Sequence, residues 1–188
     1  MDTEFLDSTN LNKFRSIEYA TFLDRFLAFL LDFLITFGPI FYLVYLGYTQ
    51  KNLMFLLISA VLGMLYKPFM EGIWGATLGK MIMKITVVDS DMATVGLGQS
   101  ILKNTIYIVS SVLGILGHFW LVGTERFQES EGYMEVAAIT QDSPYSTVTI
   151  IWMVVIIGSC FAMFASDKGQ TLHDRLANTF CVKNSSME

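Results

Sequence analysis

The chain alternates between four long apolar stretches and shorter polar segments. The apolar stretches cover residues 26–46, 53–70, 104–122 and 148–165. Each has about 18–21 residues, the length that an α-helix needs to cross about 30 Å of hydrocarbon. Backbone polar groups inside a bilayer must be paired within the protein, so we expect these stretches to be transmembrane helices. The predicted helices are, with their flanking residues, 19–46, 53–70, 101–122 and 148–165.

The polar segments predict how the helices connect. Residues 47–52 are too few for anything but a tight turn, so the first two helices should form an antiparallel hairpin. Residues 123–147 are predicted to be an acidic outer loop, with Glu125, Glu129, Glu131, Glu135 and Asp142. We therefore expect one membrane domain over 19–183, preceded by a cytoplasmic segment at 1–18 and followed by a tail at 184–188.

Two short β-branched runs predict a small sheet beside the helices. Residues 85–88 (Ile-Thr-Val-Val) end at the turn signal Asp89-Ser-Asp91, and residues 179–182 have a similar character. A single strand is unstable in water, so the two runs should pair. Residues 167–178 are expected to form a turn and a short helix. The predicted fold class is an all-α integral membrane protein with four transmembrane helices and a small cytoplasmic two-stranded β element.

The distribution of basic residues predicts the orientation in the membrane, because Lys and Arg favour the cytoplasmic side. If the N-terminus is cytoplasmic, only Lys51 and Arg126 of the 12 basic residues lie outside. The others lie inside or at the inner interface: Lys13, Arg15, Arg25, Lys67, Lys80, Lys84, Lys103, Lys168, Arg175 and Lys183. We expect a multi-pass protein of the cell (inner) membrane with both termini in the cytoplasm.

Composition supports the membrane assignment and excludes several other classes. Apolar residues make up 53% of the chain and charged residues 15%, against about 25% charged in typical soluble proteins. The net charge of −5 disfavours nucleic acid, which is bound through clusters of Lys and Arg. The acidic start of the chain lacks the basic segment of a secretory signal peptide, so we expect the first apolar stretch to be retained.

Motifs that carry catalytic chemistry are not found in the sequence. The segment from Gly75 to Lys80 has three residues between its glycines where a phosphate-binding loop needs four. Cys160 and Cys181 lack metal-ligand spacing and are interpreted as reduced thiols, and two histidines on opposite sides of the membrane are too few for a metal centre. We expect no enzyme activity and no cofactor or metal.

Ionisable residues within the predicted helices are the candidate functional residues. Arg25 and Asp32 lie on one face of the first helix, with Asp32 about 10 Å deeper. A carboxylate at that depth costs about 2.5–3.5 kcal/mol and needs a partner. Two interpretations remain open for Asp32: a polar residue that holds helices together, or an ion or proton site. Arg25 could extend to lipid phosphate, and Lys67 and Glu71 are spaced to pair along the second helix.

Asp174 stands at the start of the predicted tail helix, where a carboxylate is favoured. Only about nine residues separate it from the end of the fourth helix. The tail can therefore fold back under the first helix. We expect Arg25, Asp32 and Asp174 to form one charge network at the cytoplasmic end of the bundle.

Three stretches in this order resemble the RDD family of membrane proteins. They are residues 20–32 (ATFLDRFLAFLLD), residues 75–80 (GATLGK) through 85–89 (ITVVD), and residues 168–182 (KGQTLHDRLANTFCV). The resemblance implies that Arg25 and Asp32 are two of the residues for which the family is named, with Asp174 as the second aspartate and Asp89 as the alternative. Lys103 departs from the pattern, because an arginine would be expected there, and the acidic segment 123–147 is longer than usual.

Three hypotheses for function follow. Some family members resemble sodium/proton antiporters, so the first is a small ion or solute transporter that uses the network of Arg25, Asp32 and Asp174, with Glu71, Lys80 and Asp89 as secondary candidates. Four helices are few for alternating access, so such a transporter should form a homo-oligomer. The second is a non-catalytic accessory or scaffold protein that binds a partner membrane protein. The third is binding of a lipid headgroup near Arg25 and Lys80.

Overall fold

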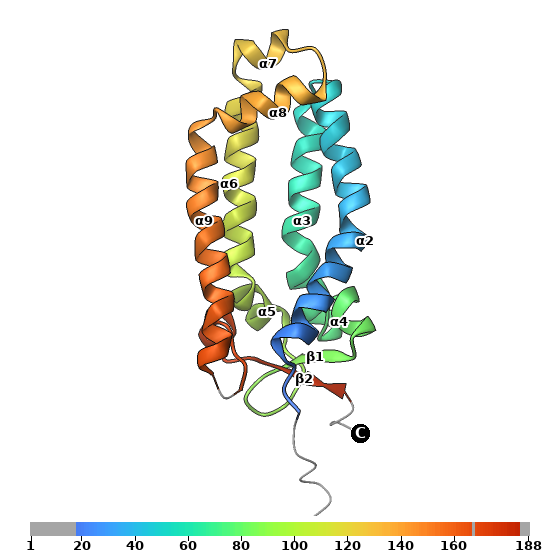
Figure 1. The fold of residues 1–188 in the computed structure, drawn as a ribbon. Helices are drawn as coiled ribbons and strands as arrows, with labels where there is room; N and C mark the ends of the chain where they lie inside the picture. Colours follow the sequence, from blue (N-terminus) through green and yellow to red (C-terminus); the bar gives the residue numbers. More distant parts are fainter. Residues whose placement is uncertain (1–17, 167, 185–188) are drawn as a thin grey trace, which may run out of the picture.

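The computed structural model describes residues 18–166 and 168–184, and four long helices run side by side through it (Figure 1). Each is long and apolar enough to cross a membrane, and this confirms the predicted class. The helices are α2 (Phe22–Thr49), α3 (Leu53–Trp74), α6 (Thr105–Val122) and α9 (Pro144–Phe161), which continues into the 3-10 turn η1 (Ala162–Ala165). The predicted segments 1–18 and 184–188, except for Glu18 and Asn184, lie outside the described residues.

The helices pack in chain order. Helix α2 packs against α3, α3 against α6, and α6 against α9, whereas α2 and α9 do not pack closely against each other. One end of the bundle, the cap end, is covered by α7 (Glu125–Glu129) and α8 (Tyr133–Gln141) (Figure 1). The other, the sheet end, carries α4 (Leu78–Ile82), α5 (Leu97–Lys103), α10 (Leu172–Leu176), β1 (Ile85–Val88) and β2 (Phe180–Lys183).

The first helix begins later and the second ends later than the sequence predicts. Helix α2 begins at Phe22, since the Thr21 side chain caps it and the two residues before Thr21 pair with β2 instead. Helix α3 continues through Pro68 as far as Trp74. It ends at Gly75, whose left-handed φ of 70° favours glycine.

The third predicted helix is divided in two. Residues 101–122 do not form one helix, because Asn104 leaves the helical conformation between α5 and α6. The Asn104 side chain donates hydrogen bonds to the Ser100 carbonyl oxygen, at 2.9 Å, and to the Glu71 carboxylate, at 3.1 Å. This break therefore places a polar side chain against α3 at the sheet end.

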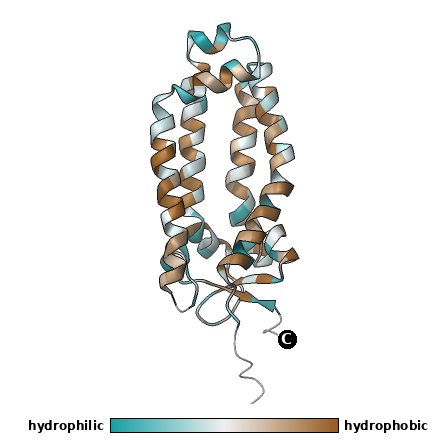
Figure 2. Ribbon diagram, in the orientation of Figure 1, coloured by the Kyte–Doolittle hydropathy of each residue, from teal (hydrophilic) through white to brown (hydrophobic). Residues whose placement is uncertain are grey.

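The acidic segment 123–147 is largely helical rather than a loop. Phe127, Val136 and Ile139 of this segment are buried against Tyr48 and Leu121, so the segment has its own apolar core. Its five acidic side chains remain exposed: Glu125, Glu129, Glu131, Glu135 and Asp142. Helix α9 consequently begins at Pro144, four residues before the predicted start. In Figure 2 the four long helices are mainly hydrophobic, and hydrophilic residues gather at the two ends.

The two-stranded sheet confirms the predicted β element. Strands β1 and β2 are antiparallel, with Ile85 opposite Lys183 and Val88 opposite Phe180. The outer edge of β2 is paired in turn with the residues before α2, where the Ala20 N–H donates to the Cys181 carbonyl oxygen at 2.8 Å. Cys181 is buried in this sheet. The sheet thereby fixes the start of α2 beside the C-terminal segment.

Candidate functional site

Arg25 and Asp174 form an ion pair at the sheet end. Asp174 lies in the first turn of α10, where its carboxylate accepts a hydrogen bond from the Thr171 N–H at 3.1 Å and the Thr171 hydroxyl caps the helix in return. The same carboxylate oxygen accepts a hydrogen bond from Arg25 Nη1 at 2.5 Å. Asp174 is only 1% exposed, so the pair joins α2 to α10 through a buried contact.

Arg25 and Asp174 are the start of a longer chain of alternating charges. Lys103 Nζ, at the end of α5, lies 3.3 Å from Asp174 Oδ1 and 3.6 Å from Glu71 Oε2. The other oxygen of Glu71 pairs with Lys80 of α4. The chain runs from Arg25 through Asp174, Lys103 and Glu71 to Lys80 and connects α2, α10, α5, α3 and α4. With three cations and two carboxylates, it carries one net positive charge.

Burial and neighbouring charge act in opposite directions on Asp174 and Lys103. Burial alone would raise the pKa of Asp174, but the charges of Lys103 and Arg25 outweigh it and hold the pKa well below its usual value. Burial alone would lower the pKa of Lys103, but the adjacent Cys181, Glu71 and Asp174 outweigh it and raise the pKa. Both groups are therefore charged at neutral pH.

His173 lies next to Asp174 in α10 but remains neutral at pH 7. Its Nδ1 lies 3.0 Å from the hydroxyl of Ser159 in α9. Burial is the main reason why the pKa of His173 falls to about 4, and the nearby Lys103 adds to the effect, while Asp174 opposes it. A neutral imidazole that bonds to a serine joins α10 to α9 without adding charge to the site.

Asp32 is held by neutral donors rather than by a cation. Its carboxylate accepts hydrogen bonds from the Tyr66 hydroxyl at 2.6 Å, the Thr77 hydroxyl at 2.6 Å and the Gly79 N–H at 2.7 Å. Asp32 and Arg25 form no ion pair, so the expected three-residue network divides into a paired Arg25 and Asp174 and a separate Asp32. Asp32 thereby docks the start of α4 on α2.

Gly79 is required by this docking. A Cβ atom at position 79 would lie 2.0 Å from the Ala28 carbonyl oxygen and 2.9 Å from Asp32 Cγ. The glycines of the segment that superficially resembles a phosphate loop therefore have a packing role: Gly75 ends α3 in a left-handed conformation, and Gly79 allows α4 to approach α2.

Asp89 and Lys67, which the sequence also singled out, have different surroundings. The Asp89 carboxylate accepts the N–H groups of Asp91 and Ala93 at 2.8 and 3.0 Å, so it shapes the turn after β1 and lies outside the charge chain. Lys67 does not pair with Glu71. Its ammonium lies 3.8 Å from the ring centroid of Tyr107 and 5.3 Å from that of Phe29, in cation–π geometry.

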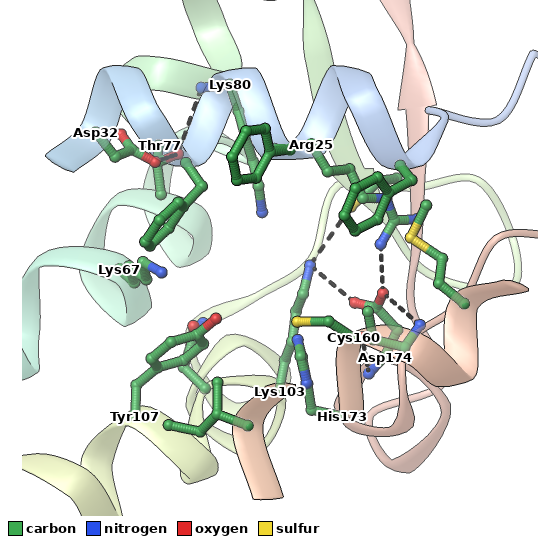
Figure 3. Close-up of a pocket in the computed structure, with 18 of the residues that line it drawn as sticks. Arg25, Asp32, Lys67, Thr77, Lys80, Lys103, Tyr107, Cys160, His173 and Asp174 are labelled. Carbon is green, nitrogen blue, oxygen red and sulfur yellow. Dashed lines mark hydrogen bonds and ion pairs between the residues drawn. The ribbon is translucent and has the colours of Figure 1, made fainter. Parts of the chain in front are cut away.

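A cavity of about 500 Å³ connects these groups (Figure 3). Its polar wall contains every member of the charge chain together with Asp32 and Lys67. Its apolar wall comes from α2 and α9, through Phe22, Phe26, Phe29, Met153, Ile156, Ile157 and Phe161. Figure 3 shows Asp32 and Lys67 on one side of this space and Lys103 and Asp174 on the other. The cavity is thus amphipathic, since charged and apolar side chains both line it.

The model of the RDD family matches residues 19–178, which is most of the chain. The chain belongs to the RDD family. The comparisons with curated proteins and with solved structures gave no match. Of the residues that the resemblance implied for this RDD protein, Arg25, Asp32 and Asp174 all line the cavity, whereas Asp89 does not.

Part of the RDD site was not expected from the sequence. Lys103 was noted only as a departure from the family pattern, yet it is buried between the two carboxylates of the chain. Tyr66 and Thr77, which bind Asp32, were not singled out at all. One feature of the sequence could have identified Lys103: a charged residue and Asn104 stand together at the start of an apolar stretch. Among the described residues, no group of His, Cys, Asp and Glu is arranged to hold a metal ion.

Proposed function

We propose that this RDD family protein is a non-enzymatic transporter that binds an anionic ligand in its amphipathic cavity. The observation that carries the proposal is the charge around the cavity. Among the described residues, Arg25, Lys67, Lys80 and Lys103 face three carboxylates, those of Asp32, Glu71 and Asp174. Asp32 already accepts three neutral hydrogen bonds, and Glu71 and Asp174 share three cations. A bound anion would balance the remaining positive charge.

The same balance disfavours a cation such as sodium. A cation site needs carboxylates that are not already neutralised, whereas both carboxylates of the charge chain are paired with Lys or Arg. The sodium/proton exchange suggested by the resemblance to antiporters therefore stands as the competing form of transport. It would require the chain to open and release Glu71 or Asp174.

The test is transport by the purified full chain in proteoliposomes. Three probes are compared: sodium, inorganic phosphate and acyl-labelled phosphatidylglycerol, the last one scored by its movement between leaflets. We expect movement of at least one anionic probe, slowed by Lys67→Gln, and no sodium flux above that of empty liposomes. The control Lys84→Gln removes the same charge from an exposed residue that does not line the cavity. Sodium flux without movement of either anionic probe would overturn the proposal.

We propose further that the sheet end faces the cytoplasm of a cell whose inner membrane holds the protein, and that the protein works as a homo-oligomer. Most described basic residues lie at the sheet end, and Lys51 and Arg126 lie at the cap end. With Cys160 and Cys181 replaced by serine, a cysteine at exposed Glu131 should react with an impermeant thiol reagent in intact cells. A cysteine at exposed Lys168 should not, and the opposite result would reverse the orientation.

An accessory role is the second candidate, and the cap end is the feature that favours it. The five acidic residues of the cap end lie in α7, in α8, between these helices and just after α8; all are exposed and take no part in the cavity. Met134, in the same segment, is 80% exposed. A partner membrane protein with a basic outer surface would complement this cap. Co-purification of such a partner, lost when the acidic residues are neutralised and retained when Lys67 is changed, would identify this role.

A further inference from the structure

We infer that the ligand of the cavity is an anionic membrane lipid, whose phosphate binds to the cationic wall and whose acyl chain lies on the apolar wall. This inference rests on the proposed binding of an anion and adds the class of ligand and its route of entry. Three observations support it. Two buried donors of Arg25 have no described hydrogen-bond partner, Lys67 has no described carboxylate within ion-pair distance, and α2 and α9 do not pack closely against each other.

The first observation concerns the Arg25 guanidinium. Only Nη1 is bound to Asp174, while Nε and Nη2 are buried and have no hydrogen-bond partner among the described residues. Buried donors without partners cost free energy, so native proteins satisfy nearly all of them. A guanidinium presents its donors as a planar fork that matches two oxygens of a phosphate. Arg25 lines the cavity, but Nε and Nη2 are covered by protein, so a phosphate in the cavity would bind them after a small turn of the side chain.

The second observation concerns Lys67. In the described part of the chain its ammonium has no carboxylate within ion-pair distance, and its contacts are the rings of Tyr107 and Phe29. Aromatic rings hold a cation in place without neutralising it. Lys67 and Arg25 both line the cavity, so they place positive charge on two sides of the space that an anionic headgroup would occupy.

The third observation distinguishes a lipid from a soluble anion. The apolar wall is formed by α2 and α9, which do not pack closely against each other. Phe26 on α2 is 44% exposed and Phe161 on α9 is 65% exposed, although both line the cavity. The wall is therefore continuous with the lipid-facing surface of the bundle. Inorganic phosphate has no apolar surface to bury against this wall, whereas an acyl chain would gain free energy by burying its surface there.

Binding is measured on the full chain, purified in a nonionic detergent and depleted of lipid. Phosphatidylglycerol is compared with phosphatidylcholine of the same acyl chains and with inorganic phosphate. Native mass spectrometry gives the stoichiometry and affinity. Cys160 and Cys181 both line the cavity, but Cys160 is half-buried and Cys181 is buried, so alkylation of Cys160 reports whether the lipid occupies this site. Cys160→Ser serves as the labelling control.

We expect one phosphatidylglycerol to bind, to slow alkylation of Cys160, and to bind about fivefold more weakly to Lys67→Gln. Lys84→Gln should bind it like the unchanged protein, because Lys84 is exposed and lies away from the cavity. Ile156→Trp should also weaken lipid binding, because it fills the apolar wall without changing a charge.

Two outcomes would overturn the inference. If phosphatidylcholine binds as tightly as phosphatidylglycerol, or if Lys67→Gln and Lys84→Gln weaken binding equally, the lipid is attracted to the protein surface in general and not to this site. Protection of Cys160 by inorganic phosphate alone, with no response to Ile156→Trp, would show a soluble anion as the ligand. If lipid binds at the site but no anionic probe moves in proteoliposomes, the transport proposal fails and the lipid site stands. If phosphate moves and lipid does not bind at the site, the lipid inference fails and the transport proposal stands.

Discussion

The residues around Asp32 and those around Asp174 stabilise these two buried carboxylates in different ways. Asp32 accepts hydrogen bonds from two hydroxyls and a backbone N–H, and none of these donors carries a charge. Asp174 has an ion pair with Arg25 and another with Lys103. Both aspartates line one cavity, and they are 5% and 1% exposed, so the difference lies in their partners rather than in burial.

The difference separates an anchor from a binding site. Around Asp32 the donors all come from the α3 to α4 region, and they hold that region on α2 by hydrogen bonds from neutral groups. Around Asp174 the cations outnumber the carboxylates, and two Arg25 donors have no described partner. A satisfied site fixes geometry, whereas a site with spare donors and charge can bind something else. We therefore propose a structural role for Asp32 and a ligand on the Arg25 side of the cavity.

Arg25→Ala should produce the largest effect. It removes one of the two cations that contact the buried Asp174, and breaking a buried ion pair costs about 3–5 kcal/mol. We expect a marked fall in the thermal midpoint of the detergent-solubilised protein and in its abundance in the membrane. Arg126→Ala is a matched control, because its pair with Asp142 is more than 60% exposed on both sides and should contribute less than about 1 kcal/mol. Equal midpoints for the two variants would contradict the assignment of Arg25.

Gly79→Ala should follow, with a loss of up to about 3 kcal/mol. The added methyl group would meet the Ala28 carbonyl oxygen, and a backbone atom cannot move away without shifting α2 from α4. Gly63→Ala makes the same change where the nearest atom is 3.8 Å away, and it should be neutral or slightly stabilising. The difference between the two thermal midpoints shows whether the contacts around Asp32 depend on the close approach of α4 to α2. A stable Gly79→Ala protein would show that it does not.

The response to pH should separate His173 from Asp174. The pKa of His173 is about 4 in the folded protein and about 6.5 when unfolded, so the unfolded state binds more protons between these values. Stability should therefore fall as pH drops from about 6.5 to about 4, by about 3 kcal/mol. His173→Gln should flatten this part of the midpoint–pH curve. A loss that begins only below about pH 4 and persists in His173→Gln would belong to Asp174, whose lowered pKa stabilises the fold above that pH.

Much of the fold was predictable because lipid restricts the alternatives. Helix length and apolar content identify four spans, and two unpaired β-branched runs predict the sheet. The helix ends were less predictable, since they depend on tertiary contacts such as the pairing of residues before α2 with β2. The helical cap was hidden because its acidic residues dominate the composition, while Phe127, Val136 and Ile139 form its buried side.

The candidate site was predictable only where one helix or one family pattern connects its members. The contact between Arg25 and Asp174 was predicted because only a few residues separate α9 from α10, so the tail can fold back. Asp32 shares a helix face with Arg25, but that spacing does not show that Tyr66, Thr77 and Gly79 would take its hydrogen bonds. The place of Lys103 in the charge chain depends on how α5 packs on α3, a contact that single-helix spacing cannot reveal.

Asp32→Asn should have the smallest effect on stability, about 1 kcal/mol. The Tyr66 hydroxyl and the Gly79 N–H both donate to Oδ1, and an asparagine oxygen at that position can still accept both. The new amide nitrogen can donate to the Thr77 hydroxyl, which reverses the bond that Thr77 now donates to Oδ2. Because no cation depends on Asp32, no buried charge loses its partner. Binding of phosphatidylglycerol should therefore stay within about twofold of the unchanged protein, and a loss as large as that of Lys67→Gln would move Asp32 from the anchor to the ligand site.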